Sequence, residues 1–203
     1  MSEVLHASAT FFLYATLAIF AQNALFARGI GVSRVIQLIG DDDTSSERFG
    51  LMLVLVCTLN APLAWVVNRL AETLPLRSAL RPLGYVLCTC AVCGALYLVL
   101  SRVHGLPRGE QLCAMLPNVG FNTCVAGTLL VATTQDFTLV QSIGFGLGSG
   151  LGFFLAVLLV AEARRRLQNG EVPQAFRGLP IVMIYIGILA LAIYGFTGHA
   201  VII

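Results

Sequence analysis

Long apolar runs dominate the chain, and polar residues gather in short stretches between them. Each run is long enough to cross about 30 Å of hydrocarbon as a helix. Little sequence is left over for a soluble domain. The pattern predicts an all-α integral membrane protein with a single domain over residues 1–203 and six transmembrane helices, at about residues 4–27, 47–69, 82–102, 112–133, 138–162 and 179–198.

Two of the apolar runs are interrupted by polar and turn-forming residues. The first breaks down at QNALFARGIG (22–31) and the fourth at LPNVGFNTCVAG (116–127). The first and fourth runs are the first spans of two halves of the chain, about 1–105 and 106–203. Because each half has three spans, the two halves enter the bilayer from opposite sides. The spacing therefore predicts two inverted three-helix repeats, with the first and fourth helices broken near the midplane. Asn23 and Asn118 occupy matching places in the two breaks.

Irregular backbone at that depth is tolerated only where protein buries it or where it lines a cavity. The breaks carry polar side chains suited to either role. One hypothesis is therefore a small inverted-repeat transporter or channel-like subunit, whose midplane path for an ion or solute is lined by Gln22, Asn23, Asn118, Asn122 and Thr123.

Composition agrees with a membrane protein, since 58% of residues are hydrophobic, 11% are charged and the mean hydropathy is +0.88. All the basic residues are arginines. Most fall in the connections after spans one, three and five, and only Arg69, Arg77 and Arg81 lie on the other side. By the positive-inside rule this bias predicts that both termini are outside. A net charge of +2 gives no reason to expect a nucleic-acid partner.

Glycines and cysteines supply the remaining patterns. Gly144, Gly148 and Gly152 recur at a spacing that favours close helix packing.

Five of the six cysteines occur in regular helical runs, where small thiols are typical packing residues. Cys124 differs because it lies in the second break. It is the candidate functional thiol, as a cofactor or metal ligand.

Several stretches resemble the Rnf/Nqr membrane-subunit family, most closely its A-type members of Rnf (E in Nqr). RRRLQNGEVPQAFRGLPI (164–181) with YGFTG (194–198) is similar to the closing third of the family. GVSR (31–34) resembles the family's GVSK, and FNTCVAG (121–127) resembles TTNCAVLG, with Cys124 on the family's cysteine.

The resemblance implies a subunit of a Rnf-type ferredoxin:NAD+ oxidoreductase complex in the bacterial inner membrane, which couples electron transport to Na+ or H+ movement. Its implied partners are a homologous six-helix sister subunit of opposite topology and flavin-binding and ferredoxin-like subunits. The two sister subunits would share a [2Fe–2S] cluster, each supplying one cysteine from each break, with Cys124 as one ligand. Any enzyme activity would belong to the assembly.

The first break departs from the family pattern. Counting back from Gly31 places Ala27 where the family has its cysteine, and comparison of the two breaks places Gly29 there. Because such a cluster normally has four protein ligands, three possibilities follow. Cys57 or Cys113 takes the missing place, the sister subunit compensates, or the chain binds no cluster.

Overall fold

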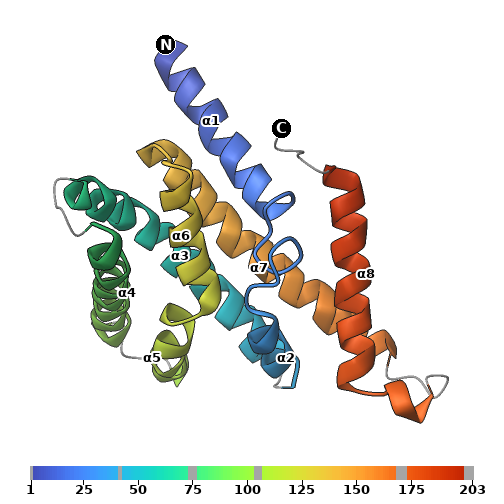
Figure 1. Cartoon of the computed structure of the whole chain (residues 1–203). Coiled ribbons are helices and arrows are strands. Elements are labelled where there is room, and N and C mark those ends of the chain that lie inside the picture. The colour runs from blue at the N-terminus through green and yellow to red at the C-terminus, as the bar shows by residue number, and fades with distance from the viewer. Residues whose placement is uncertain (1, 41–42, 73–76, 103–106, 168–172, 199–203) are drawn as a thin grey trace.

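The computed structural model describes residues 2–40, 43–72, 77–102, 107–167 and 173–198, and in these ranges every regular element is a helix (Figure 1). In chain order they are α1 (Ser2–Ile19), α2 (Val32–Gly40), α3 (Asp43–Ala71), α4 (Arg77–Arg102), α5 (Pro107–Gly120), α6 (Thr123–Thr134), α7 (Leu139–Leu167), the short 3-10 helix η1 (Gln174–Phe176) and α8 (Leu179–Thr197).

Four helices are long and apolar enough to cross a membrane. They are α3 from Ser46, α4 from Leu80, and the whole of α7 and α8. Gln111–Gly120 of α5 and α6 together make a fifth candidate, bent by 45° at the break between them. The apolar part of α1, Glu3–Ile19, is shorter. The prediction of a helical integral membrane protein is confirmed, whereas the inverted repeat and the position of the termini stay predictions.

Both predicted interruptions are present, but the first begins earlier than expected. Helix α1 ends at Ile19 rather than near residue 27, and residues 20–31 form a series of turns before α2 begins. The second interruption is confined to residues 121–122, between α5 and α6. Pro117 lies inside α5 and does not end it.

The glycine-rich helix α7 packs between α1 and α3. A Cβ added at Gly148 would lie 2.2 Å from the carbonyl oxygen of Ala15 on α1, and one at Gly144 would lie 2.5 Å from that of Phe11. On the α3 side, a Cβ at Gly150 would lie 2.6 Å from the Cα of Val54. The predicted packing role of the glycines is thus confirmed, and it extends to a second face of α7.

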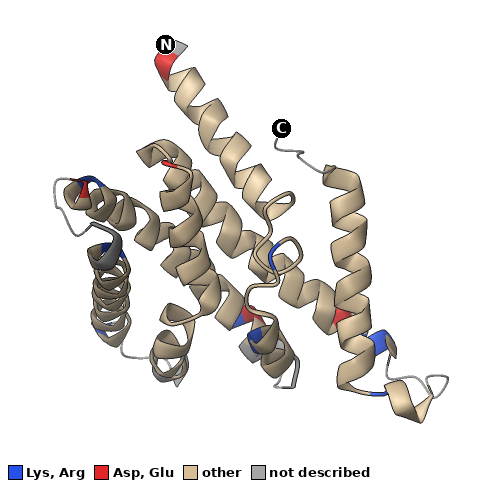
Figure 2. Ribbon diagram, viewed as in Figure 1, with Lys and Arg blue, Asp and Glu red and all other residues tan. Residues whose placement is uncertain are grey.

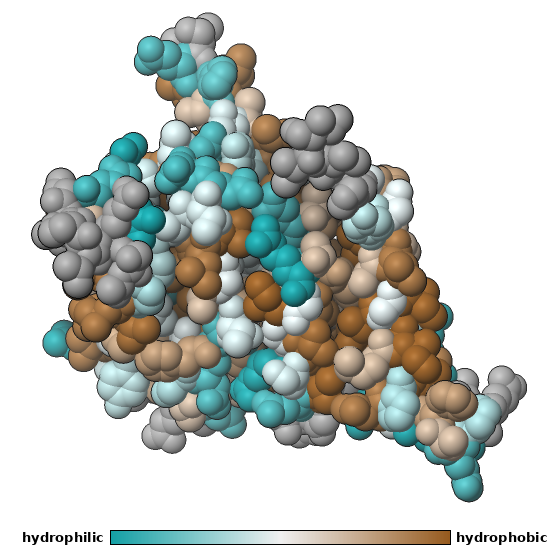
Figure 3. Space-filling model, viewed as in Figure 1, coloured by the Kyte–Doolittle hydropathy of each residue, from teal (hydrophilic) through white to brown (hydrophobic). Residues whose placement is uncertain are grey.

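Charged residues lie mainly at helix ends and in the first break, and the middle of the bundle carries few (Figure 2). Apolar side chains cover most of the surface over α8 (Figure 3). Helix α8 is the least enclosed of the long helices, with 11% of its most apolar window buried, and Phe196 is 91% exposed. An outer surface of this kind suits a lipid environment, because no water has to cover it.

Candidate functional site

The first break is organised around the side chain of Asn23, which is fully buried. Its Oδ1 accepts hydrogen bonds from the backbone N–H groups of Leu25 (2.9 Å) and Phe26 (3.2 Å). Its Nδ2 donates to the carbonyl oxygens of Ile19 (2.8 Å) and Gly152 (3.1 Å). An Asn amide has two donor hydrogens and one acceptor oxygen, and all are used. Asn23 therefore holds the break in shape and has no spare group to offer a passing ion.

The second break is organised in the same way by Asn122, the N-cap of α6. Its Oδ1 accepts from the backbone N–H of Cys124 at 2.9 Å, and the residue is 5% exposed. Asn118 is an exposed residue within α5. The predicted match between Asn23 and Asn118 is therefore wrong, because only Asn122 caps the chain as Asn23 does.

This correction also changes the residue that corresponds to Cys124. Both asparagines accept from the backbone N–H two residues later, so Leu25 in the first break corresponds to Cys124 in the second. Leu25 is 1% exposed and Cys124 is 0% exposed. Like Ala27 and Gly29, Leu25 brings no thiol to the first break.

A second thiol nevertheless lies beside Cys124. The side chain of Cys57, on α3, contacts the Cys124 thiol and the Thr128 hydroxyl. Thr128 Oγ1 in turn donates to the carbonyl oxygen of Cys124 at 2.8 Å. Both cysteines are 0% exposed. Of the two cysteines that sequence reasoning left open as substitutes, the structure brings Cys57 to Cys124, while Cys113 is a half-buried residue of α5.

The three cysteines of α4 do not form a cluster with this pair. Cys90 is exposed, Cys88 is half-buried, and Cys93 packs against Gly120 at the end of α5. Within the described ranges, no three or more His, Cys, Asp or Glu side chains are grouped so that they could hold one metal ion.

A polar cavity of about 240 Å³ lies between α2 and the second break. It is lined by Arg34, a residue that sequence reasoning used in the charge bias and in the GVSR resemblance but not as a site residue. Arg34 Nη1 donates to Gln37 at 3.0 Å, and its guanidinium carbon lies 4.8 Å from the ring centroid of Phe49. The described residues that line the cavity include no acidic side chain; they are Ser33, Arg34, Gln37, Pro117, Asn118, Phe121, Asn122 and Thr123.

Two buried donor atoms of residues that line this cavity have no hydrogen-bond partner among the described residues. They are Arg34 Nε and Asn122 Nδ2. The orientation of the Asn122 amide is fixed, because its oxygen must face the N–H of Cys124 to cap α6. The cavity therefore carries the permanent positive charge of Arg34, and its Ser, Thr, Asn and Gln side chains bring both donor and acceptor atoms.

An apolar groove of about 220 Å³ adjoins the polar cavity on the other side of the second break. The two share Phe121 and Asn122. Phe121 is 63% exposed, so the boundary between them is open to the surroundings of the chain. Apart from Asn122, the groove is lined mainly by apolar atoms of Pro82, Tyr85, Val86, Thr89, Gly120, Phe121, Ala126, Leu129 and Leu130.

The five polar residues predicted to line one path fall into three separate environments. Asn118, Asn122 and Thr123 line the polar cavity, and Asn23 is enclosed in the core. Gln22 lines a different cavity of about 690 Å³ between the first break and α8, and accepts a hydrogen bond from Arg28 Nη2 at 3.2 Å. The structure thus brings together three of the five.

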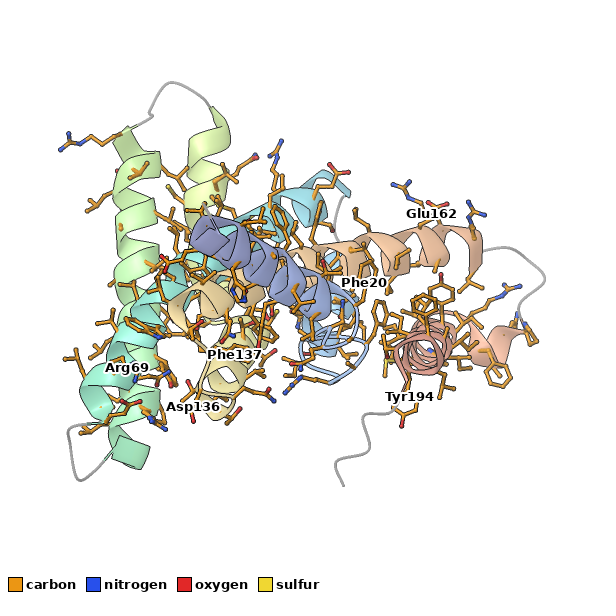
Figure 4. The ribbon with its side chains drawn as sticks, turned by 90° about the horizontal axis from the view of Figure 1, so that it is seen from above. Phe20, Arg69, Asp136, Phe137, Glu162 and Tyr194 are labelled. Atoms are coloured by element: carbon orange, nitrogen blue, oxygen red, sulfur yellow. The ribbon has the colours of Figure 1, made fainter. Side chains whose placement is uncertain are left out.

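A further cavity, of about 730 Å³, lies where the end of α3, the start of α4 and the end of α6 meet. Arg69, Asp136 and Phe137 come together there (Figure 4). Arg69 pairs with Glu72 at 3.3 Å. A hydrogen-bonded triad also contributes to this cavity, and it consists of Tyr85, Asn68 and Thr133. Sequence reasoning missed this cavity because its residues come from three helices and share no motif.

The interrupted helices, the glycine-packed bundle and the apolar exterior define a polytopic helical membrane protein built around two chain breaks. The family described as "Rnf-Nqr subunit, membrane protein" matches residues 11–200, and the chain belongs to this family.

Similar proteins include the A subunits of ion-translocating oxidoreductase complexes from several bacteria. That of the Na(+)-translocating ferredoxin:NAD(+) oxidoreductase complex of Acetobacterium woodii is 27% identical over 89% of this chain and 93% of its own length. That of the ion-translocating oxidoreductase complex of Syntrophotalea carbinolica is 29% identical over 89% and 93%. The protein of the same name from Yersinia enterocolitica is 35% identical over 73% and 77%.

Proposed function

We propose that this chain is a membrane subunit of a Rnf-type ion-translocating oxidoreductase complex, in the place of its A-type member. The observation that carries the proposal is the family match over residues 11–200, together with A-type relatives that align over most of both chains. In such an assembly, electrons pass between ferredoxin and NAD+ while Na+ or H+ crosses the membrane. The chain supplies part of the membrane-spanning framework for that coupling.

The proposed setting is a bacterial inner membrane, with both termini on the outer side. The start of α1 and the end of α8 lie at the same side of the bundle (Figure 1), as an even number of crossings requires. The arginine bias supports the orientation. The proposed partners are a homologous six-helix sister subunit of opposite topology and the flavin-binding and ferredoxin-like subunits of the complex.

The [2Fe–2S] cluster implied for this family has to be weighed against the thiols that are present. In kind, Cys57 and Cys124 match half of a four-thiolate ligand set. A cluster could not reach them in this arrangement, because both thiols are 0% exposed and neither lines the three cavities described around the breaks. The enclosed pair therefore does not fit a cluster in access, and Cys124 as a cluster ligand stays a prediction from the sequence.

Membership of the complex is tested by affinity purification of the tagged full-length chain from its own membranes. The expected result is co-purification of a six-span sister subunit together with flavin and iron. If the chain is recovered without any redox subunit, the proposal is wrong.

The cluster is tested on the same purified complex by iron content and electron spin resonance. Cys124→Ser and Cys57→Ser are compared with Cys90→Ser, which alters an exposed thiol on α4. From the enclosure of the pair we expect equal iron in all three variants. A loss of the two irons of one cluster in Cys124→Ser alone, or in both pair variants, would establish the ligand assignment without affecting the proposed membership.

A cation path through the second break is the weaker alternative. The three break residues that share a cavity, Asn118, Asn122 and Thr123, share it with Arg34. A guanidinium that cannot lose its proton repels Na+ at short range. The geometry around the second break thus favours an acceptor or an anion over a cation.

A further inference from the structure

We propose that the first break docks against a membrane-spanning helix of a different subunit, and that a carboxylate on this helix pairs with Arg28. The inference rests on the proposed place of the chain in a multi-subunit membrane complex. It is carried by the depth of Arg28 in the bundle, by its exposure and by the positions of the described carboxylates of this chain.

Both sides of the first break are held against the middle of α7. Before Arg28, the side chain of Asn23 donates to the carbonyl oxygen of Gly152 at 3.1 Å. After it, a Cβ added at Gly31 would lie 2.6 Å from the ring of Phe153. Gly152 and Phe153 lie halfway along a helix that is long and apolar enough to cross a membrane. Arg28 is three residues from Gly31, so their Cα atoms are at most about 11 Å apart.

The half-helix α2 leads to the same depth. Ser46, where the membrane span of α3 begins, donates its hydroxyl to the carbonyl oxygen of Leu38 at 2.8 Å. Leu38 therefore lies near the membrane end of α2, and Val32, six residues earlier, lies about 9 Å further in at 1.5 Å per residue. The chain enters the first break there, beside α7 (Figure 1). Arg28 therefore belongs to the membrane interior and not to a connection, and the arginine bias keeps its sign without it.

The surface around Arg28 is open. Ala27, Arg28 and Gly29 are all exposed, and a Cβ added at Gly29 would meet no atom within 4 Å. The hydrogen-bond partner of Arg28 among the described residues is Gln22, whose Oε1 lies 3.2 Å from Nη2. A guanidinium has five N–H donors and cannot lose its charge. One neutral amide oxygen therefore leaves that charge without compensation.

An uncompensated guanidinium that faces lipid at this depth is unfavourable. Arginines inside membranes are rare, and they pair with other groups or face a water-filled cavity. The cavity of about 690 Å³ beside the first break gives water few partners, because apolar side chains such as Leu17, Phe26, Leu191 and Ile193 make up most of its lining. The favoured compensation is a carboxylate supplied by protein.

The same cavity gives the docking helix its place. It lies between the first break and α8, the least enclosed of the long helices. On α8, a Cβ added at Gly187, one turn before Leu191, would meet no atom within 4 Å, so a second backbone has room to approach. A helix in this position would cover apolar side chains of α8 and bring its own side chains to the level of Arg28.

A second copy of this chain offers no described carboxylate at that level. The described acidic residues lie at or near helix ends (Figure 2). Glu162 on α7 is ten residues beyond Gly152, which is about 15 Å along the helix at 1.5 Å per residue. The partner is therefore a different membrane subunit, with an aspartate or glutamate near the middle of one span.

The first experiment maps what covers the first break in the intact complex. Photoreactive benzoylphenylalanine replaces Ala27, which is exposed beside Arg28, in the tagged full-length chain. After irradiation of native membranes, the cross-linked peptide is identified by mass spectrometry. We expect a membrane-spanning segment of another subunit, with an Asp or Glu near the cross-linked residue.

The second experiment tests the charge. In Arg28→Gln, the amount of the cross-linked subunit that stays with the purified chain should fall on the order of tenfold, because its carboxylate is left buried without a counter-charge. Arg28→Lys keeps the charge and should retain most of the subunit. Arg102→Gln removes an exposed arginine at the end of α4 and is the matched control, with no expected loss. Neutralising the identified carboxylate together with Arg28→Gln should restore part of the retention.

Three results would overturn the proposal. Cross-links to lipid or to a second copy alone would show that no other subunit covers the first break. Equal retention in Arg28→Gln and Arg102→Gln, with the redox subunits still present, would contradict the ion pair and leave membership of the complex intact. Recovery of the unaltered chain without any other subunit would contradict the membership itself, and the docking site with it.

Discussion

The side chain of Asn23 donates a hydrogen bond to the carbonyl oxygen of Gly152, 129 residues further along the chain, at 3.1 Å. This contact joins the first break to the middle of α7. It is possible because a Cβ at Gly152 would itself lie 2.9 Å from Asn23 Nδ2, so only glycine leaves room for the amide. The break is thus anchored to the most enclosed helix of the bundle.

Replacing Asn23 is expected to destabilise the protein. Asn23→Ala leaves the N–H groups of Leu25 and Phe26 buried without the partner that they have in Asn23 Oδ1, which should lower the free energy of unfolding by roughly 1–3 kcal/mol. The measurement is reversible unfolding in mixed detergent micelles. Asn118→Ala is the control, since Asn118 is exposed, and it should stay within about 0.5 kcal/mol of the unaltered protein.

The positions of the two breaks could be predicted from the sequence because turn-forming and polar residues stand out against long apolar runs. Their internal correspondence could not be predicted. Asn118 and Asn122 are four residues apart in one segment, and only the backbone shows which of them caps a helix. Matching Asn23 to Asn122 instead of Asn118 shifts the comparison by four residues, so that Cys124 corresponds to Leu25 and not to Gly29.

Close packing of α1 against α7 gives a second prediction. In Gly148→Ala, the new Cβ would meet the backbone of Ala15 at 2.2 Å and could not be accommodated by rotating a side chain. Overpacking of this kind costs typically 1–3 kcal/mol, about the expected loss of stability. Gly187→Ala, at a position on α8 with no atom within 4 Å of the added Cβ, should leave stability unchanged or slightly higher. Equal effects of the two substitutions would contradict this packing.

The contents of the candidate site show where sequence reasoning stops. Cys124 could be singled out because it lies in a break, and Cys57 could be named only as one of two substitutes. Their contact depends on how α3 and α6 cross. Arg34 was not among the predicted site residues, since nothing in GVSR indicates that its Nε is buried or that its side chain shares a cavity with Asn122. Long-range packing supplied what the local pattern lacked.

The enclosure of Cys57 and Cys124 predicts a wide spread of thiol reactivity. In detergent, Cys90 is exposed on α4 and should react readily with N-ethylmaleimide. The two buried thiols should react only when the fold opens, and therefore slower by several orders of magnitude in a stable protein. Mass spectrometry of the labelled peptides over time gives the rates, with Cys90→Ser as the control for peptide assignment. Rapid labelling of Cys124 in the folded chain would contradict its burial.

Orientation in the membrane is the last prediction, and it rests on the arginines. If both termini are outside, alkaline phosphatase fused after α8 should be active and a green fluorescent protein at the same place should be dark. The same two reporters fused after α7, beside Arg164, Arg165 and Arg166, should give the reverse result. Because the bias sets the orientation, changing these three arginines to glutamine should weaken the contrast between the two fusion sites. A fluorescent reporter after α8 would place that end in the cytoplasm and contradict the predicted orientation.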